Sequence, residues 1–291
     1  MIIFDTLAGI GDVSWVYSKI VNLTKTREVG LRICDDPPAR CKDFVDLLPG
    51  IKNMGYGRPD RYITNWLPYD ADLAGLQDGE YGINLNWFLE AGMRIETIFP
   101  HQPTQYHYAY NTERYRSTAS ELLERAKGKR RIGFFCDSKH GNPRRRFWPP
   151  EQWADFFLRV AKVVPEVSFF ALGASWDTRT ANVAKLLQGR GLDCISLVGQ
   201  TSIGATVEVL RGLNYFFVVN AGLGMICDVL NVPTFMWYWG NYADEPWGMH
   251  FPDSYADPEN VKFYRHINFN LAPVDKSFNH FQEFGQRWAL A

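Results

Sequence analysis

The chain has 291 residues, of which 46% are hydrophobic and 22% charged, a balance that excludes an intrinsically disordered chain and suits two ordinary domains. Lysine and arginine together number 31 and aspartate and glutamate 32, so the formal net charge is -1. A protein that binds nucleic acid by bulk positive charge is therefore disfavoured, whereas a local basic patch is compatible with this balance.

The first part of the chain contains one clear strand-turn-helix unit and then a less regular stretch. An apolar run at Met1–Phe4 leads through a glycine turn into a segment whose apolar residues recur at helical spacing as far as Val21. The further elements expected here are a strand at 31–34, a polar helix around 39–47, short strands and loops within 49–103, and a helix at 117–127. The polar run that follows, 128–131, marks the expected domain boundary.

From residue 131 onward, apolar runs typical of buried strands alternate with segments of helical periodicity. The expected strands are 131–135, 167–173, 194–197, 215–219 and 234–238, and the expected helices are 150–163, 180–187, 203–210 and 224–230. This alternation predicts a doubly wound parallel sheet, which binds ligands at the carboxyl ends of its strands.

The cysteines indicate a reducing environment. There are five (Cys34, Cys41, Cys136, Cys194 and Cys227), an odd number without a CxxC pair, which disfavours a disulfide framework and a thiolate zinc site. No apolar run approaches the length of a membrane span, and residues 1–12 lack the basic start and long apolar stretch of a signal peptide. We therefore expect a cytoplasmic protein with buried thiols and no membrane span.

Three strand ends carry candidate functional residues, and the first is the turn Gly9-Ile10-Gly11-Asp12. Glycine lets the backbone turn tightly and approach a ligand, and the amides at the start of the following helix point into the same space. A carboxylate on the first helical turn, as at Asp12, can cap the helix or act as a general base. The motif alone is compatible with either role.

The second strand end opens a polar loop that contains Ser138, Lys139 and Arg144–Arg146 ahead of a Trp-Pro-Pro element at 148–150. Phosphate oxygens are bound by charged donors and backbone amides, and this loop offers both. A solvated basic loop is the alternative. The position at a strand end favours phosphate binding.

The third strand end runs from an apolar strand into the small-residue turn Asn220-Ala221-Gly222 and then a helix. The amides of Ala221 to Met225 would point out of the helix start, where the helix dipole favours an anion. The glycines, Gly222 and Gly224, can instead serve only close packing of helix on strand. Because this turn and the second loop follow strands of one parallel sheet, we expect both at the same edge.

The order of these motifs resembles that of the heptosyltransferase-like glycosyltransferases of family nine, over nearly the whole chain. The family's Gly-x-Gly-Asp turn is matched by residues 9–12, and its Lys-x-Trp-Pro element by residues 146–149. Its Leu-x-Gly-x-Thr-Ser turn is matched by residues 197–202. Its Asp-x-Gly-x-x-His helix start is matched by residues 220–225, and the Val-Pro strand that follows by residues 232–233. Arg146 replaces the family's lysine, Asn220 its aspartate and Met225 its histidine. The backbone-amide cradle needs only the turn and Gly222, so we expect it to survive these changes.

The resemblance implies the GT-B fold, an α/β architecture of two facing Rossmann-like domains with parallel sheets. We expect an acceptor-side domain at 1–127, a nucleotide-sugar-binding domain at 128–265, and a C-terminal segment at 266–291 whose helix returns to the first domain. An amphipathic cap on the second domain is the alternative for that helix.

The resemblance also implies the inverting transfer of a sugar from a nucleotide-diphosphate sugar to an acceptor hydroxyl of a lipopolysaccharide core or another glycan. Asp12 would be the catalytic base, and neither a metal nor another cofactor is expected, in keeping with the lack of a histidine cluster with ligand spacing. The residues expected to bind the donor are Gly9, Gly11, Ser138, Lys139, Arg146, Thr201, Asn220, Ala221, Gly222, Leu223 and Gly224.

Two other functions fit parts of the sequence. A DNA-base glycosyltransferase of the type carried by viruses of bacteria would use the basic runs Lys129–Arg131 and Arg144–Arg146, with the abundant aromatics, on DNA. A non-catalytic binding module of the same fold would account for Asn220 and Met225. A Rossmann dehydrogenase is disfavoured, because the first turn lacks a third glycine and no acidic residue follows a clear second strand at the expected distance.

Overall fold

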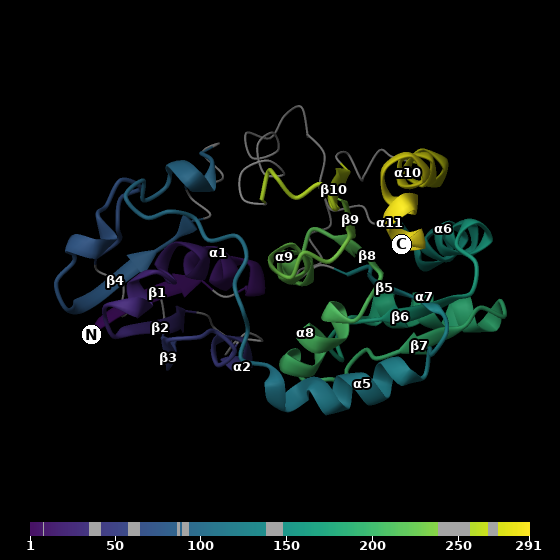
Figure 1. Cartoon of the computed structure of the whole chain (residues 1–291), viewed down its shortest axis with the longest axis horizontal. Helices are drawn as coiled ribbons and strands as arrows, with labels where there is room; N and C mark the ends of the chain where they lie inside the picture. Colours follow the sequence, from purple (N-terminus) through teal and green to yellow (C-terminus); the bar gives the residue numbers. More distant parts are fainter. Residues whose placement is uncertain are drawn as a thin grey trace. The chain divides into compact units, whose positions relative to one another are not determined.

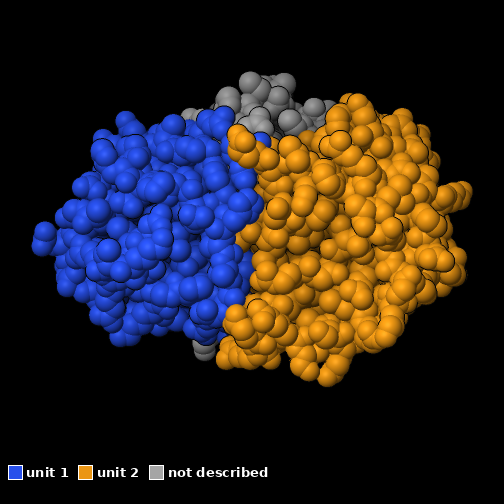
Figure 2. Space-filling model, in the orientation of Figure 1, with its two compact units in different colours: residues 1–111, 246–258 blue, residues 112–245, 259–291 orange. Residues whose placement is uncertain are grey.

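The computed structural model describes residues 1–7, 9–34, 42–57, 65–85, 88, 93–137, 148–237, 257–266 and 273–291. The chain divides into two compact units, unit 1 with residues 1–111 and 246–258 and unit 2 with residues 112–245 and 259–291 (Figure 2). Each unit is built around a parallel sheet of its own.

Unit 2 follows the predicted alternation of strands and helices (Figure 1). Its strands are β5 (Arg130–Phe135), β6 (Val167–Ala171), β7 (Cys194–Ser196), β8 (Tyr215–Val219), β9 (Thr234–Trp237) and β10 (Phe263–His266). Its main helices are α5 (Arg116–Glu124), α6 (Pro150–Val163), α7 (Thr178–Gly189), α8 (Ile203–Arg211), α9 (Gly222–Val229), α10 (Val274–His280) and α11 (Gln286–Leu290), with short turns η4 (Glu113–Tyr115) and η7 (Phe281–Gly285). The strands are parallel and lie in the order β10-β9-β8-β5-β6-β7, which confirms the predicted doubly wound sheet.

The helix α5 belongs to unit 2, whereas the sequence predicts that it closes the first domain at residue 127. Tyr115, which precedes α5, lies against Gly204 of α8, and a Cβ atom at Gly204 would collide with the tyrosine ring. Leu123 covers Gly212 at the end of α8 in the same way. These two glycines give α5 its packing surface, so the division between the units falls at Asn111/Thr112 rather than at the polar run after α5.

The last helices also differ from the expected return to the first domain, because they cap unit 2. The helix α10 packs against α6, and α11 packs against β5, where the guanidinium of Arg130 donates a hydrogen bond of 2.9 Å to the carbonyl of Ala291. Gly285, between the two helices, leaves room for the hydroxyl of Tyr215. This arrangement is the amphipathic cap that was the alternative interpretation.

The core of unit 2 accounts for much of the aromatic content of the chain. Trp153 and Trp237 are at most 1% exposed, and their rings meet edge to face with centroids 4.9 Å apart. Phe156, Phe157 and Phe217 surround them and are equally buried. Edge-to-face pairs of this kind add to the free energy gained from burial alone. In the described part of unit 2, the aromatics therefore serve mainly as core.

Unit 1 has a smaller sheet in the order β3-β2-β1-β4, again with every described pair parallel. Its strands are β1 (Ile2–Leu7), β2 (Val29–Cys34), β3 (Ile51–Gly57) and β4 (Gly79–Ile83), and its helical segments are α1 (Ile10–Ile20), η1 (Leu23–Lys25), α2 (Lys42–Val45), η2 (Leu73–Gly75) and η3 (Ile95–Thr97). Ile2 and Phe4 of β1 are fully buried, as are Val13 and Ile20 of α1, which packs against β1. The sequence indicates β3 and β4 only as short strands within an irregular stretch.

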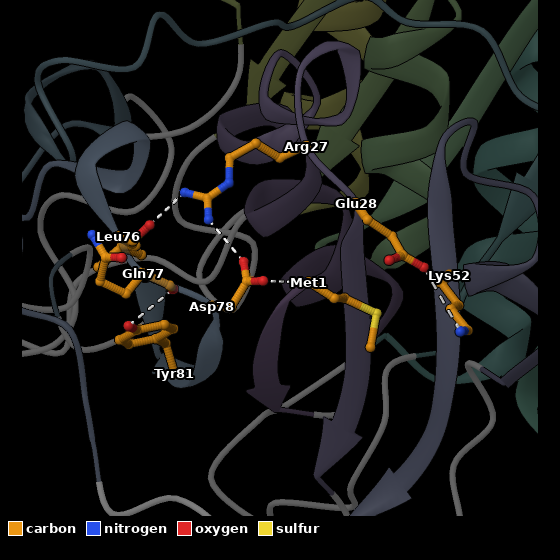
Figure 3. A network of polar contacts seen from close by, with 8 residues as sticks. All are labelled: Met1, Arg27, Glu28, Lys52, Leu76, Gln77, Asp78 and Tyr81. Atoms are coloured by element: carbon orange, nitrogen blue, oxygen red, sulfur yellow. Dashed lines mark hydrogen bonds and ion pairs between the residues drawn. The ribbon is translucent and has the colours of Figure 1, made fainter.

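Ion pairs hold the amino-terminal edge of this sheet together. The carboxylate of Asp78, just before β4, binds the amino group of Met1 at 2.6 Å and the guanidinium of Arg27 at 2.9 Å (Figure 3). Arg27 also donates to the carbonyl of Leu76. The hydrogen bond from the amino terminus lowers the pKa of Asp78. These contacts bring the start of β4 to the start of β1, although the two strands are far apart in the sequence.

An extended segment, 101–110, runs along α1 in unit 1 and alternates between buried or half-buried residues at even positions and mostly exposed residues at odd positions. The amide of Gln105 donates to the carbonyl of Ser18 at 2.8 Å, and the fully buried Lys19 donates to the carbonyl of Gln102 at 3.1 Å. At the far side of the segment, His107 pairs with Asp257 at 2.8 Å. Burial lowers the pKa of Lys19 to about 8, against the opposing attraction of Glu96.

The free energy of unfolding of the wild-type protein should rise relative to that of a Lys19→Met variant as the pH increases from about 8 to about 10. The pKa of Lys19 is about 8 in the folded chain, below its unfolded value, so the unfolded chain binds more protons in this range and stability rises with pH. The expected change is roughly 1 to 3 kcal/mol, measured by urea denaturation at fixed ionic strength. Tyrosine titration is common to both proteins and cancels. Parallel stability curves would contradict the burial of this amine.

Candidate functional site

The order of strands in unit 2 places a topological switch point between β5 and β8. From β5 the chain proceeds outward through β6 and β7, and from β8 it proceeds the other way through β9 and β10. Phe135 lies opposite Val218 in the register, so both strands end at the same edge of the sheet. Crevices at the carboxyl ends of strands at such a point are the usual ligand sites of open α/β sheets.

The segment after β5 is anchored at both of its described ends. At one end, the carboxylate of Asp137 accepts hydrogen bonds from the amide of Thr180 at 2.9 Å and from its hydroxyl at 3.2 Å, while that hydroxyl accepts from the amide of Cys136 at 3.0 Å. At the other end, Trp148 is 6% exposed and packs on Trp237 with ring centroids 5.8 Å apart. The predicted phosphate-binding residues Ser138, Lys139 and Arg146 lie between these anchors, outside the described residues.

The turn after β8 presents backbone amides at the same edge. The helix α9 begins at Gly222, and Ala221 precedes it in an extended conformation with φ -158° and ψ 164°. The amide of Asn220 donates to the carbonyl of Trp237 at 2.9 Å, which fixes the turn to β9. Asn220, Ala221 and Gly222 are half-buried, whereas Leu223 is buried. The amide of Gly224 donates to the carbonyl of Ala221 at 2.9 Å. The amides of Gly222 and Leu223 lack intrahelical acceptors and lie at the positive end of the helix dipole, so this turn can bind an anion.

Gly224 and Met225 face the interior rather than this edge. A Cβ atom at Gly224 would collide with the Cε atom of Met236 and lie 3.2 Å from Cγ1 of Val218, so this glycine allows α9 to pack closely on β8 and β9. Met225 is 5% exposed. Gly224 therefore serves the close packing of helix on strand, which was the alternative interpretation of the glycines.

The turn before α8 is shaped by Gly199. Its φ is +71°, and a Cβ atom there would lie 2.9 Å from the Cα atom of Ser175, in the loop that follows β6. The amide of Gly199 donates to the carbonyl of Gly173 at 2.8 Å, so the loops after β6 and β7 are joined. A side chain at position 199 would separate them, which explains the glycine of the Leu-x-Gly-x-Thr-Ser motif.

Thr201, a predicted donor-binding residue, uses its hydroxyl within this turn. The hydroxyls of Thr201 and Thr206 are 2.8 Å apart, and that of Thr206 donates to the carbonyl of Ser202 at 3.0 Å. A hydroxyl has one hydrogen to donate, so Thr201 donates to Thr206 and its oxygen is left as an acceptor. Ser202 caps α8 by accepting from the amide of Ala205 at 3.3 Å. In this arrangement the motif stabilises the start of α8.

In unit 1, the Gly9–Asp12 turn lies at the carboxyl end of β1, whose neighbours β2 and β4 lie on opposite sides of it. The helix α1 begins at Ile10 and is preceded by Gly9 in an extended conformation. A Cβ atom at Gly9 would collide with Oδ2 of Asp12, so the carboxylate folds back over the start of the helix. Asp12 is half-buried. A carboxylate at this position is stabilised by the helix dipole.

Clusters of metal-ligating side chains are not found in the described ranges. There, no group of three or more histidine, cysteine, aspartate or glutamate side chains is arranged to hold a metal ion. The sequence does contain an Asp-x-Asp pair, Asp70 and Asp72, a pattern found in some metal sites. It lies in unit 1, where Asp72 accepts a hydrogen bond from the amide of Ala74 at 3.0 Å and caps η2.

None of the helices described is long and apolar enough to span a bilayer.

The cysteines at 34, 136, 194 and 227 are buried free thiols, as expected, and Cys41 lies outside the described residues. Burial raises the pKa of the Cys194 thiol to about 12, which suppresses its reactivity at neutral pH.

Two residues at the carboxyl edge of unit 2 are not singled out by the sequence motifs. Asp137 anchors the segment after β5, and Trp176 lies exposed in the loop after β6. Each lies within a few positions of the end of a predicted strand, and this placement could have identified both residues from the sequence. The sequence gives no indication, however, that Thr180 of the distant helix α7 is the partner of Asp137.

The sequence matches no protein-family model and no curated protein. Its fold, however, matches solved structures along nearly its whole length. The E. coli ADP-heptose lps heptosyltransferase II superposes with a TM-score of 0.65 at 13% identity, covering 97% of this chain and 98% of that chain. A glycosyl transferase family 9 structure from Veillonella parvula DSM 2008 gives 0.65 at 13% identity, covering 99% and 97%. The glycosyltransferase TibC of enterotoxigenic E. coli H10407, described as iron-containing and dodecameric, gives 0.52 at 10% identity, covering 98% and 76%.

The chain thus has the fold of the heptosyltransferase-like glycosyltransferases, and the GT-B architecture predicted from the motifs is confirmed. The similarity at 13% identity or less concerns the fold. The Gly-x-Gly-Asp turn and the Asn220–Gly222 turn each lie at a strand end of the unit in which they were expected.

Replacement of Gly199 by alanine should destabilise unit 2 more than replacement of Gly191. Gly191 also has a positive φ, +80°, but no atom lies within 4 Å of where its Cβ would be, so Gly191→Ala incurs only backbone strain, about 1 to 2 kcal/mol. Gly199→Ala adds the collision with Ser175, worth about 1 to 3 kcal/mol more. Urea denaturation of the two variants measures the difference. Equal destabilisation would mean that the loops after β6 and β7 are not held against each other.

Proposed function

We propose that this protein is an inverting glycosyltransferase that moves a sugar from a nucleoside-diphosphate sugar to an acceptor hydroxyl. The observation that carries the proposal is the switch point of unit 2, where the amides at the start of α9 adjoin the end of β5. An anionic diphosphate fits such a site, because helix amides and cations together stabilise phosphate oxygens.

Arg146 precedes Trp148 by two positions in the sequence. Trp148 packs on Trp237, whose carbonyl accepts the amide hydrogen bond of Asn220. We assign the guanidinium of Arg146 to the diphosphate, together with Ser138 and Lys139, because Trp148 packs on the strand to which the turn at the start of α9 is hydrogen-bonded. Ala221, Gly222 and Leu223 contribute the amides, since the amide of Asn220 is bound to the carbonyl of Trp237.

Asp12 is assigned the role of general base, which removes the proton from the acceptor hydroxyl as its oxygen attacks the anomeric carbon from the face opposite the leaving group. The folding back of its carboxylate over the start of α1 supports the assignment, because Gly9 leaves room for the carboxylate where a larger residue would displace it. Gly9 and Gly11 allow close approach of a ligand to the backbone. Cations and the dipole of α9, rather than a metal ion, would stabilise the leaving diphosphate.

A glycan is the acceptor we favour, in line with the names of the structural neighbours, one of which is a lipopolysaccharide heptosyltransferase. Two of the three cations in the first basic run of the DNA alternative have partners within unit 2. Lys129 pairs with Asp193 at 2.7 Å, and Arg130 binds the carbonyl of Ala291, so these cations are already occupied within unit 2. A non-catalytic module is disfavoured by the presence of Asp12 in the first turn of α1. A cytoplasmic location remains a prediction from the sequence.

An Asp12→Asn variant should lose roughly 100-fold or more of kcat and bind the donor nucleotide with nearly unchanged Kd, because the amide keeps the shape of the side chain but cannot accept the proton. Transfer of sugar from ADP-heptose, UDP-glucose or GDP-mannose to a lipopolysaccharide core acceptor gives kcat, and calorimetry with the corresponding diphosphate gives Kd. Asp72→Asn is the matched control, since asparagine also caps a helix. Loss of nucleotide binding by folded Asp12→Asn protein would refute the role assigned to Asp12.

Replacement of Arg146 by glutamine should weaken binding of the nucleoside diphosphate by roughly ten- to a hundredfold, since it removes a charged hydrogen-bond donor. Calorimetry at two salt concentrations checks the effect, because a charge contact is weakened by salt. Arg159→Gln, on the exposed part of α6, serves as the control. If both variants bind with the wild-type Kd, the diphosphate does not contact Arg146.

A further inference from the structure

Trp176 differs from the other described tryptophans in its exposure to solvent. It is 53% exposed, whereas Trp15, Trp148, Trp153 and Trp237 are at most 7% exposed. The remaining two, Trp66 and Trp288, are half-buried. A single exposed aromatic residue is ordinary on a protein surface. Its place in the fold and the rigidity of its support therefore decide whether it can bind a ligand.

The place of Trp176 is the carboxyl edge of the unit 2 sheet, in the loop between β6 and α7. The strand β6 pairs directly with β5, with Ala171 opposite Phe134. The loop that carries Trp176 is therefore one strand spacing, about 5 Å, from the end of β5 and the switch point. A nucleoside diphosphate whose phosphates lie at the switch point extends beyond that spacing, so its nucleoside can reach this loop.

The loop is held by contacts on three sides. The carboxylate of Asp177 accepts a hydrogen bond from the amide of Ala174 at 2.7 Å, which closes the loop on itself. The carbonyl of Gly173 binds the amide of Gly199, which joins the loop to the next strand end. The carbonyl of Trp176 accepts from the amide of Thr178 at 2.9 Å, at the start of α7. Because the backbone around Trp176 is fixed before any ligand arrives, little entropy is lost when a planar group stacks on the indole.

We infer that Trp176 is the stacking platform for the nucleobase of the donor, an inference that rests on the proposed binding of a nucleoside diphosphate to unit 2. Every nucleobase has a π face, so an indole contributes affinity for the nucleoside without choosing the base. Trp176 therefore acts in binding of the donor and not in the transfer step.

The test is calorimetric titration of wild type, Trp176→Ala and Trp176→Phe with ADP, GDP, UDP and CDP in turn, and with inorganic pyrophosphate as the base-free probe. For the diphosphate that wild type binds most tightly, Trp176→Ala should raise Kd about tenfold or more, and Trp176→Phe should stay within a few-fold of wild type. Pyrophosphate should bind all three proteins equally. Tyr69→Ala, at another exposed aromatic, is the matched control and should have no effect.

The outcomes separate this inference from the function on which it rests. If wild type binds none of the nucleoside diphosphates, the proposed function fails and the inference fails with it. If wild type binds one of them and Trp176→Ala binds it with the same Kd, only the inference is overturned. An equal loss of nucleoside diphosphate and pyrophosphate also overturns it, because the change would then act on the phosphate site. Should Trp176→Ala not fold, Trp176→Phe and Trp176→Leu provide the same comparison of an aromatic with an aliphatic side chain.

Discussion

The parallel pairing of β5 with β8 is the contact on which the candidate site of unit 2 depends. It brings together two strands that are separated in the sequence by β6, β7 and the helices around them, and its register ends both at one edge. The segments that leave this edge are fixed by different means. Asp137 is hydrogen-bonded to α7, Trp148 is inserted into the aromatic core, and Asn220 is bound to the backbone of β9. The candidate site is thus made of loop residues that are held in place by the sheet beneath them.

Glycines in the shared motifs occupy their positions for different physical reasons. Gly9 leaves space for the carboxylate of Asp12, which lies three residues further along the same turn. Gly199 needs both a left-handed backbone and close approach to a neighbouring loop. Gly224 leaves space for a methionine side chain in the core. The glycines of these motifs therefore serve side-chain placement, loop geometry and packing, and only the structure separates these roles.

The sequence predicts those features that depend on local patterns. The helix α6 and the strand β8 are found at the predicted bounds, because an amphipathic period with proline at its start and an unbroken apolar run are unambiguous. Features that depend on distant partners are not predicted. The packing of α5 on α8, the edge strand β10 and the cap formed by α10 and α11 are settled by surfaces elsewhere in unit 2.

The same distinction applies to the candidate site. The positions of Asp12 and of the Asn220–Gly222 turn follow from strand ends, which can be recognised in the sequence. The engagement of Thr201 with Thr206, the partner of Asp137 and the exposure of Trp176 are consequences of tertiary structure. The roles of Ser138, Lys139 and Arg146 in binding the donor are proposals.

The division of the chain into units has a consequence for synthesis and folding. Residues 246–258 belong to unit 1 but are synthesised after most of unit 2. The chain then returns to unit 2 with the strand β10 and the helices that cover its core. The pairing of His107 with Asp257 joins the first part of unit 1 to this later segment, and the pairing of β9 with β10 joins the parts of unit 2 on either side of it. Neither unit is a contiguous piece of polypeptide, so a nascent chain on the ribosome cannot complete one before beginning the other. Unit 1 has all of its residues once the chain has passed residue 258, whereas unit 2 is completed only by β10 and the carboxyl-terminal helices. A protein shortened before α10 would therefore keep every residue of unit 1 and lack the cap of unit 2.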